Sequence, residues 1–106
     1  MIITNMDHVP GYETVECLGL VRANVVRAKH MGKDIVAGLK NIVGGEIREY
    51  TEMMSESREI AIKRMEKKAR ELGADGILNV RFMTSAIAGQ AAEIMAYGTA
   101  VRLRKK

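Results

Sequence analysis

Cysteine and histidine are the residues of this sequence best suited to hold a metal ion. The candidates are Cys17, His8 and His30, with methionine thioethers as further ligands for a soft ion. Thiolates and imidazoles bind such ions only where several of them converge. The three candidates stand far apart and show no Cys-x-x-Cys or His-x₃-His spacing. We therefore expect Cys17 to be a small buried strand residue and both histidines to be solvated, unless a symmetric assembly gathers copies of one ligand.

Two adjacent glycines, Gly44 and Gly45, precede a predicted helix and could bind an anion. The free amides at a helix N-terminus carry partial positive charge and attract anions. No Lys-Ser or Lys-Thr follows the glycines, as a phosphate-binding loop requires, and Glu46 and Glu49 place negative charge in the same region. A plain turn is the simpler interpretation.

Other polar candidates lie on predicted strands. Arg27 belongs to a basic stretch from Arg22 to Lys40 that could meet an anion or nucleic acid, although the stretch lacks stacking aromatic residues. Three further residues fall on neighbouring predicted strands, where opposite side chains approach within about 5 Å: Asn79, Arg81 and Glu93. They could bind a polar ligand or simply form cross-strand pairs.

Catalytic motifs are missing from the sequence. It contains neither GxSxG nor HExxH, and no serine has a histidine beside it that could act as a base. We predict a protein that is not an enzyme.

The strongest structural signal is a helix from about Ile47 to Leu72. Apolar or small residues recur there every three or four positions, with charged residues opposite, which is typical of an amphipathic helix. The stripe consists of Tyr50, Met54, Ser57, Ala61, Met65, Ala69 and Leu72. Gly73 follows as a left-handed cap residue.

Strands are predicted on both sides of this helix. Residues 1–12 could form a short strand or an irregular arm, and Thr14–Ala28 reads as a long strand with Val15, Cys17, Val21, Ala23 and Val25 on one face. A short helix beginning at Asp34 and ending at the paired glycines comes next. After Asp75-Gly76 we expect strands 77–87 and 91–104, joined by a hairpin loop at Ala88-Gly89-Gln90.

These elements predict a single α+β domain, residues 1–106, in which one long helix and a short one cover a small antiparallel sheet as a two-layer sandwich. The chain has one cysteine and no signal-like or membrane-spanning stretch, so we expect a cytoplasmic protein and no membrane partner. Its net charge is +4.

The last predicted strand is apolar on both faces for most of its length. Ala92, Ile94 and Ala96 alternate with Met95, Tyr97 and Val101. One helical layer covers only one face of a sheet, and a bare apolar face invites association. We therefore expect a homo-oligomer.

Four blocks of the sequence together resemble the YbjQ-like family of small uncharacterised proteins. They are LVRANVVRA from Leu20, DIVAGLKNIVGGEIREYTEM from Asp34, ADGILNVRF from Ala74 and AYGTAV from Ala96. The resemblance implies a dodecin-like sandwich, assembly as a ring-shaped homopentamer, and a heavy-metal ion as candidate cofactor.

The sequence thus predicts a homo-oligomeric binding module that holds a metal ion or small ligand at its subunit interfaces. The alternative is binding of an anion or nucleic acid through the basic stretch from Arg22 to Lys40, for which the missing aromatic residues make nucleic acid the less favoured partner.

Overall fold

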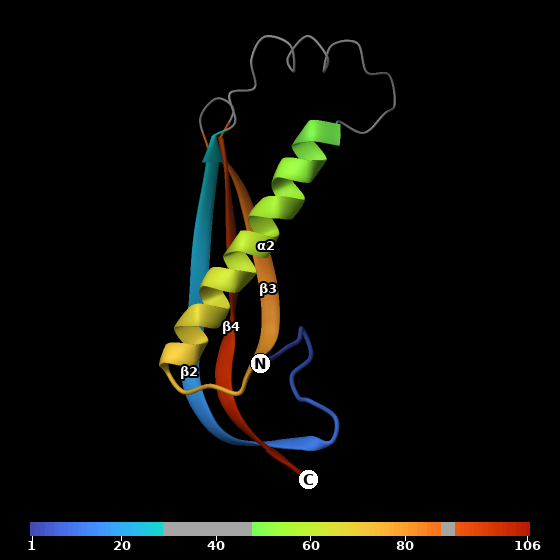
Figure 1. Ribbon diagram of the computed structural model, residues 1–106, viewed down its shortest axis with the longest axis vertical. Coiled ribbons are helices and arrows are strands. Elements are labelled where there is room, and N and C mark those ends of the chain that lie inside the picture. Colours follow the sequence, from blue (N-terminus) through green and yellow to red (C-terminus); the bar gives the residue numbers. More distant parts are fainter. Residues whose placement is uncertain (29–47, 88–90) are drawn as a thin grey trace.

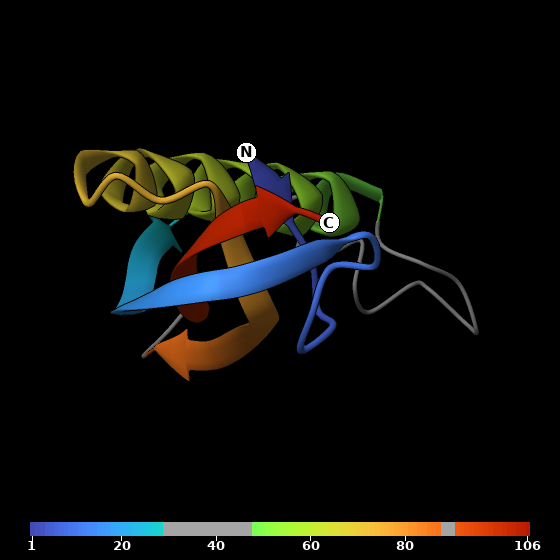
Figure 2. The ribbon, with the colours of Figure 1, turned by 90° about the horizontal axis from the view of Figure 1, so that it is seen from below.

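The computed structural model describes residues 1–28, 48–87 and 91–106 of the chain. It contains strands β1 (Ile2–Ile3) and β2 (Tyr12–Ala28), helix α2 (Arg48–Glu71), and strands β3 (Gly76–Ile87) and β4 (Ala91–Lys105). The helix crosses the sheet diagonally and covers one of its faces (Figures 1 and 2). This is the predicted α+β arrangement of one long helix on a sheet.

The strands form one four-stranded mixed sheet in the order β1-β3-β4-β2. β4 pairs antiparallel with both β2 and β3, as predicted. The expectation of an antiparallel sheet fails only at β1, which pairs parallel with β3. The reason is that the N-terminal arm lies along the edge of β3, where the Ile2 amide donates to the Asp75 carbonyl and the Thr4 amide to the Ile77 carbonyl.

The described part of helix α2 ends within one residue of the predicted C-terminal bound. Its buried stripe contains Met54, Ala61, Met65 and Ala69, and Gly73 follows with a φ of 83°. Full burial of a methionine such as Met65 contributes about 1.5–3 kcal/mol.

Two residues of the predicted stripe need separate comment. The buried Ser57 hydroxyl donates to the Met53 carbonyl at 2.7 Å, which satisfies a polar group inside the core. Leu72, in contrast, was expected to be buried and is 47% exposed, because it lies beyond the last helical residue.

In β2 the predicted apolar face is divided by two irregularities. Val21, Ala23 and Val25 are buried under the helix, whereas Val15 and Cys17 are exposed. The register of β2 against β4 shifts between Thr14 and Glu16 and again between Cys17 and Gly19. Each shift places an extra residue in β2 and so breaks the simple alternation of faces. The prediction that Cys17 is buried is therefore wrong.

A third irregularity divides β3. Leu78 lies opposite Thr99 and Arg81 lies opposite Tyr97, so Asn79 and Val80 together face Gly98. Asn79 has a φ of 52°, a backbone conformation that asparagine tolerates better than most residues. A side chain at Gly98 would meet the Ile77 side chain at 2.8 Å and the Leu78 carbonyl at 2.9 Å. Glycine is needed there because the bulge leaves no room.

Several predictions concern residues outside the described ranges. They are the short helix that begins at Asp34, the hairpin loop at residues 88–90, and the candidate site residues His30, Gly44 and Gly45.

Candidate functional site

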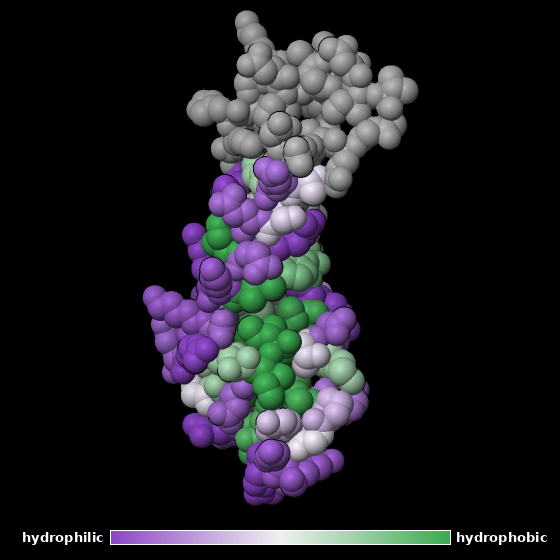
Figure 3. Space-filling view, turned by 45° about the vertical axis from the view of Figure 1, so that its right-hand side comes forward, coloured by the Kyte–Doolittle hydropathy of each residue, from purple (hydrophilic) through white to green (hydrophobic). Residues whose placement is uncertain are grey.

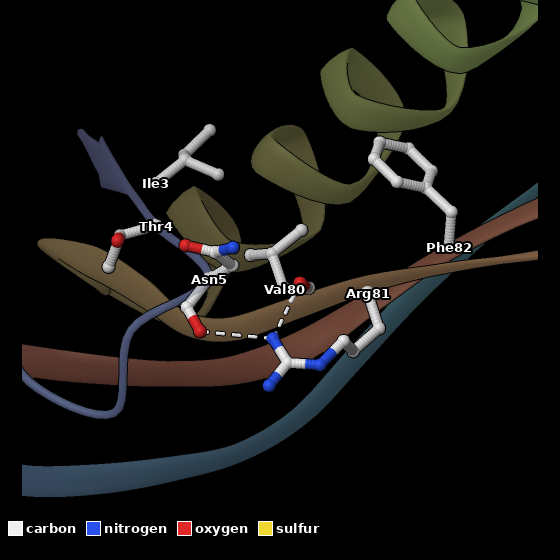
Figure 4. Close-up of a pocket in the computed structure, with 6 residues that line it drawn as sticks. All are labelled: Ile3, Thr4, Asn5, Val80, Arg81 and Phe82. Atoms are coloured by element: carbon white, nitrogen blue, oxygen red, sulfur yellow. Dashed lines mark hydrogen bonds between the residues drawn. The ribbon is translucent and has the colours of Figure 1, made fainter.

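A hollow of about 430 Å³ opens beside β3, where the N-terminal arm leaves the sheet. It is lined by Ile3, Thr4, Asn5, Val80, Arg81 and Phe82. Figure 4 shows Ile3, Val80 and Phe82 on the helix side of β3, and the Arg81 side chain on the other side of the strand. The hollow therefore combines an apolar wall with a guanidinium at its border.

The hollow exists because the arm and the bulge meet at this point. The arm follows β3 as far as the bulge, where the Val80 amide donates to the Thr4 carbonyl and the Asn79 amide to the Met6 carbonyl. Arg81 then closes this pairing, since its Nη1 donates to the carbonyls of Asn5 and Val80 at 3.0 Å each. A guanidinium has five N–H groups, so further donors remain for a carboxylate or another anion.

Beyond Arg81, β3 has no neighbour on its outer side among the described residues. The helix packs mainly on β2 and β4 rather than on β3. All six residues from Arg81 to Ala86 are exposed, including Phe82 at 41% and Met83 at 51%. Figure 3 shows a strip of hydrophobic surface between hydrophilic flanks in the lower part of the molecule. We call residues Arg81–Ala86 the free edge of β3.

The opposite edge of the sheet is occupied by side chains of the helix. Lys68 Nζ donates to the Arg22 carbonyl at 2.8 Å, and Arg64 Nη1 donates to the Asn24 carbonyl at 3.0 Å. These carbonyls point away from β4, so the two cations lie where a further strand would pair. We call Arg22–Asn24 with these two cations the capped edge of β2. In the sequence both cations belong to the charged face of the predicted helix, which is expected to be solvated. Only their spacing of four residues, which places them on the same side of the helix, indicates that they act together.

A smaller hollow of about 290 Å³ adjoins the capped edge. Arg64, Lys67 and Lys68 line it together with Glu71. The hollow is basic on balance, but two of its three cations already bind carbonyl groups.

The predicted cluster of Asn79, Arg81 and Glu93 is spread out by the register. Arg81 lies opposite Tyr97, whereas Glu93 lies opposite Ser85. Four residues along β4 separate Tyr97 from Glu93, which is about 13 Å in an extended strand. Asn79 adopts the positive φ of the bulge in β3, and it is exposed. Of the three, only Arg81 borders the hollow.

Arg27 forms an ion pair that spans the two layers. Its Nη2 lies 3.4 Å from Glu56 Oε2 on the helix. The Arg27 side chain is 35% exposed and that of Glu56 is 63% exposed, so solvent screens the pair and it contributes little to stability. Arg27 lies on the helix side of β2, since its partner in the sheet is the buried Ala92.

Within the described residues, the candidate ligands His8 and Cys17 do not form a heavy-metal site. His8 Nδ1 lies 2.6 Å from Asp7 Oδ1, and this hydrogen bond, together with the charge of the ring, holds the pKa of Asp7 below its usual value. Cys17 lies in β2, opposite Val101. Across residues 1–28, 48–87 and 91–106, no three His, Cys, Asp or Glu side chains gather closely enough to hold a metal ion. Met53, Met54 and Met65 are buried in the core, as their helical spacing predicted.

Within the same described part of the chain, no helix is both long and apolar enough to cross a membrane.

Relatives of this sequence are found in archaea and bacteria. A UPF0145 protein of Archaeoglobus fulgidus is 62% identical over 104 residues, which cover 98% of this chain and 96% of the relative. One of Dehalococcoides mccartyi is 58% identical over 95% of this chain and 97% of its own length.

A solved structure shares the fold. It is a protein of unknown function from Pediococcus pentosaceus, assigned to the DUF74 family, with a TM-score of 0.68, 19% identity and coverage of 98% of both chains. At that identity the likeness supports the fold alone.

The model of one protein family matches residues 1–104, and its description reads "Putative heavy-metal-binding". This match covers nearly the whole chain and agrees with the relatives above. The chain therefore belongs to the YbjQ family.

Proposed function

We propose that this protein is a non-enzymatic binding module of the cytoplasm that assembles as a ring of identical chains, five in number, and holds a small ligand at the junctions between them. The observation that carries the proposal is the uncovered half of β3, where exposed Phe82 and Met83 adjoin the hollow. A strand with apolar residues exposed on both sides resembles an interior strand without its neighbour.

The chemistry of the hollow favours a ligand with an apolar body and an anionic group. Ile3, Val80 and Phe82 supply apolar contacts, and the Arg81 guanidinium supplies charge and hydrogen-bond donors. The hollow is open, so a neighbouring chain would be needed to enclose a ligand.

A metal ion is the weaker form of the proposal. The family description names heavy metals. In the described part of one chain, Asp7 and His8 form a close pair of potential ligands without a third. A ring repeats each ligand once per chain, so copies of His8, Cys17 or His30 could still meet around an axis.

Native mass spectrometry of protein purified without chelator tests this proposal. At micromolar concentration we expect a mass of five chains, with any bound ligand retained. A monomer would contradict the proposal.

Titration with zinc and Cu(I) tests the metal form separately. Stoichiometric binding that is lost in Cys17→Ser or His8→Ala would support it. Pentamers that bind neither ion would exclude it and leave the ligand form standing.

Anion binding at the capped edge of β2 is a second candidate. Arg64, Lys67 and Lys68 lie together beside the smaller hollow, although Glu71 shares it and the carbonyls engage two of the cations. Binding of this kind weakens as salt screens the charges. Salt-sensitive retention on heparin would support it, and passage through the column at low salt would exclude it.

A further inference from the structure

The sheet has an open face on the side away from helix α2. The helix covers the other face (Figure 2), and no helix or strand in the described ranges lies over this one. Val21 and Ala23 are buried under the helix, so Arg22 between them lies on the open face. Tyr97 follows the buried Ala96 in β4 and lies on the same face. The open face thus carries a cation beside an aromatic residue.

The strand register adds a second arginine to this position. Tyr97 lies opposite Arg22 in β2 and opposite Arg81 in β3. Figure 4 shows the Arg81 side chain on the other side of β3 from Val80 and Phe82, which is the open face. Opposite side chains on neighbouring strands begin about 5 Å apart. The three residues therefore form a row across three strands, and we call Arg22, Tyr97 and Arg81 the arginine–tyrosine row.

Both arginines have hydrogen-bond donors to spare. Arg22 is exposed, and no described residue forms a hydrogen bond or an ion pair with its side chain. Arg81 is exposed as well, and its bonds to the Asn5 and Val80 carbonyls come from one nitrogen, Nη1. A guanidinium has five N–H groups, so Nε and Nη2 of Arg81 remain for an anion.

Negative charge is distant from this row along the strands. Within residues 20–28, 78–87 and 91–101, the sequence contains one acidic residue, Glu93. It stands four positions before Tyr97 in β4, which is about 13 Å along an extended strand. That distance exceeds the screening length of about 8 Å at physiological salt. The row therefore favours an anionic partner.

We propose that the arginine–tyrosine row binds single-stranded nucleic acid. Each base within a polynucleotide lies between two backbone phosphates, and the row offers one aromatic ring between two guanidiniums. A base stacks on the Tyr97 ring, while the phosphates on either side of it bind Arg22 and Arg81. Other proteins also stack the bases of single-stranded RNA on aromatic residues of a four-stranded sheet. A duplex does not fit, because its bases already stack on one another.

Tyr97 supplies the aromatic residue that the basic stretch from Arg22 to Lys40 lacks. The sequence alone disfavoured nucleic acid for that reason. Pairing between β2 and β4 places Tyr97 beside Arg22, although 74 positions separate them in the chain. This site goes beyond the proposed function, because the row is complete within one chain and needs no subunit junction.

Substitutions of Tyr97 test the stacking. Fluorescence anisotropy of labelled single-stranded DNA and RNA measures the dissociation constant, and circular dichroism confirms the fold of each variant. Tyr97→Leu removes the aromatic ring and should raise the dissociation constant at least ~5-fold, as expected for the loss of one stacked base. Tyr97→Phe keeps the ring and should bind like the wild type. Unchanged affinity in a folded Tyr97→Leu variant would overturn the proposal.

Arg22→Gln tests the phosphate contact, and the exposed position of Arg22 leaves the core intact. The dependence of log affinity on log salt concentration should become shallower by about 0.7, the value for one contact to a single strand. Lys67→Gln is the matched control, since it removes the same charge from the helix beside the smaller hollow. We expect its slope to stay unchanged. Equal changes in the two variants would assign binding to the capped edge of β2 and overturn the proposal.

Competition distinguishes the possible forms of the ligand. Unlabelled single strands should displace the label, whereas a duplex of the same sequence and a mononucleotide should compete much more weakly. Equal displacement by either of the two would overturn the proposal. A wild-type protein that binds neither DNA nor RNA at low salt would also overturn it, and the proposed function would still stand.

Discussion

The two strands that flank β4, β2 and β3, differ along the sides that face away from it. At β2 the helix reaches over the edge and places Lys68 and Arg64 on two backbone carbonyls. At β3 the N-terminal arm departs near Arg81, and the rest of the strand stays bare within the described structure. Helix side chains thus occupy two carbonyls of β2, whereas residues Arg81–Ala86 of β3 have no neighbour on their outer side in the described structure.

Matched proline substitutions give the largest expected contrast between the two edges. Thr84→Pro removes an outward amide from the free edge, and Asn24→Pro removes an outward amide from the capped edge. Neither amide faces β4, so neither change should break the existing sheet. We expect Thr84→Pro to weaken association by about 2 kcal/mol or more, and Asn24→Pro to leave it unchanged.

Light scattering over a dilution series measures both variants. If the two proline variants lost association equally, the outer sides of β2 and β3 would not differ in their ability to bind another chain.

The bulge of β3 offers the next contrast, because it fixes where the free edge begins. Gly98→Ala would force a methyl group against Ile77 and the Leu78 carbonyl. We expect the free energy of unfolding to fall by about 1–3 kcal/mol, as for other overpacked sites. Urea denaturation measures the loss. Thr99→Ala, one residue along β4, is the control, and a similar loss there would argue against a special role for the bulge.

Removal of the two cations that cap β2 should have the smallest effect on the free energy of unfolding. It should also change the size of the assembly. Lys68→Met and Arg64→Met keep the length of each side chain but remove its hydrogen bond. Because water can replace the lost donor at an exposed carbonyl, we expect each change to cost about 0.5–1.5 kcal/mol.

The double variant should also form assemblies larger than the wild type, since both edges would then be open. Light scattering that shows no growth beyond the wild-type mass would contradict the protective role of the two cations.

The sequence predicted the helix and the main strands well, because their patterns depend on local spacing. The 3.6-residue stripe placed the C-terminal end of the helix within one residue, and the alternation in β4 grouped Ile94, Ala96 and Ala100, which are buried, on one face. Gly73 was also predicted correctly as the left-handed residue after the helix.

The bulges were the main source of error. Alternation places Cys17 on the same face as Val21, but the one extra residue between Cys17 and Gly19 puts them on opposite faces. Gly19, with a φ of 104°, and Gly98 are isolated glycines within strands, and such glycines often mark bulges. That signal could have corrected the prediction for Cys17.

The geometry of the candidate site could not be predicted from the sequence, because it depends on contacts between segments that are far apart in the chain. Arg81 was singled out from the sequence, but its bond to Asn5 requires the N-terminal arm to return along β3. The caps on β2 require the diagonal crossing of the helix, which no local pattern specifies.

Amide hydrogen exchange of the wild-type protein tests the central claim most directly, because it reports on both edges without any substitution. The amides of Phe82, Thr84 and Ala86 should become protected as the protein is concentrated from monomer to assembly, while those of Arg22 and Asn24 keep their exchange rates. Protection that rises at the β2 amides and not at the β3 amides would contradict the account.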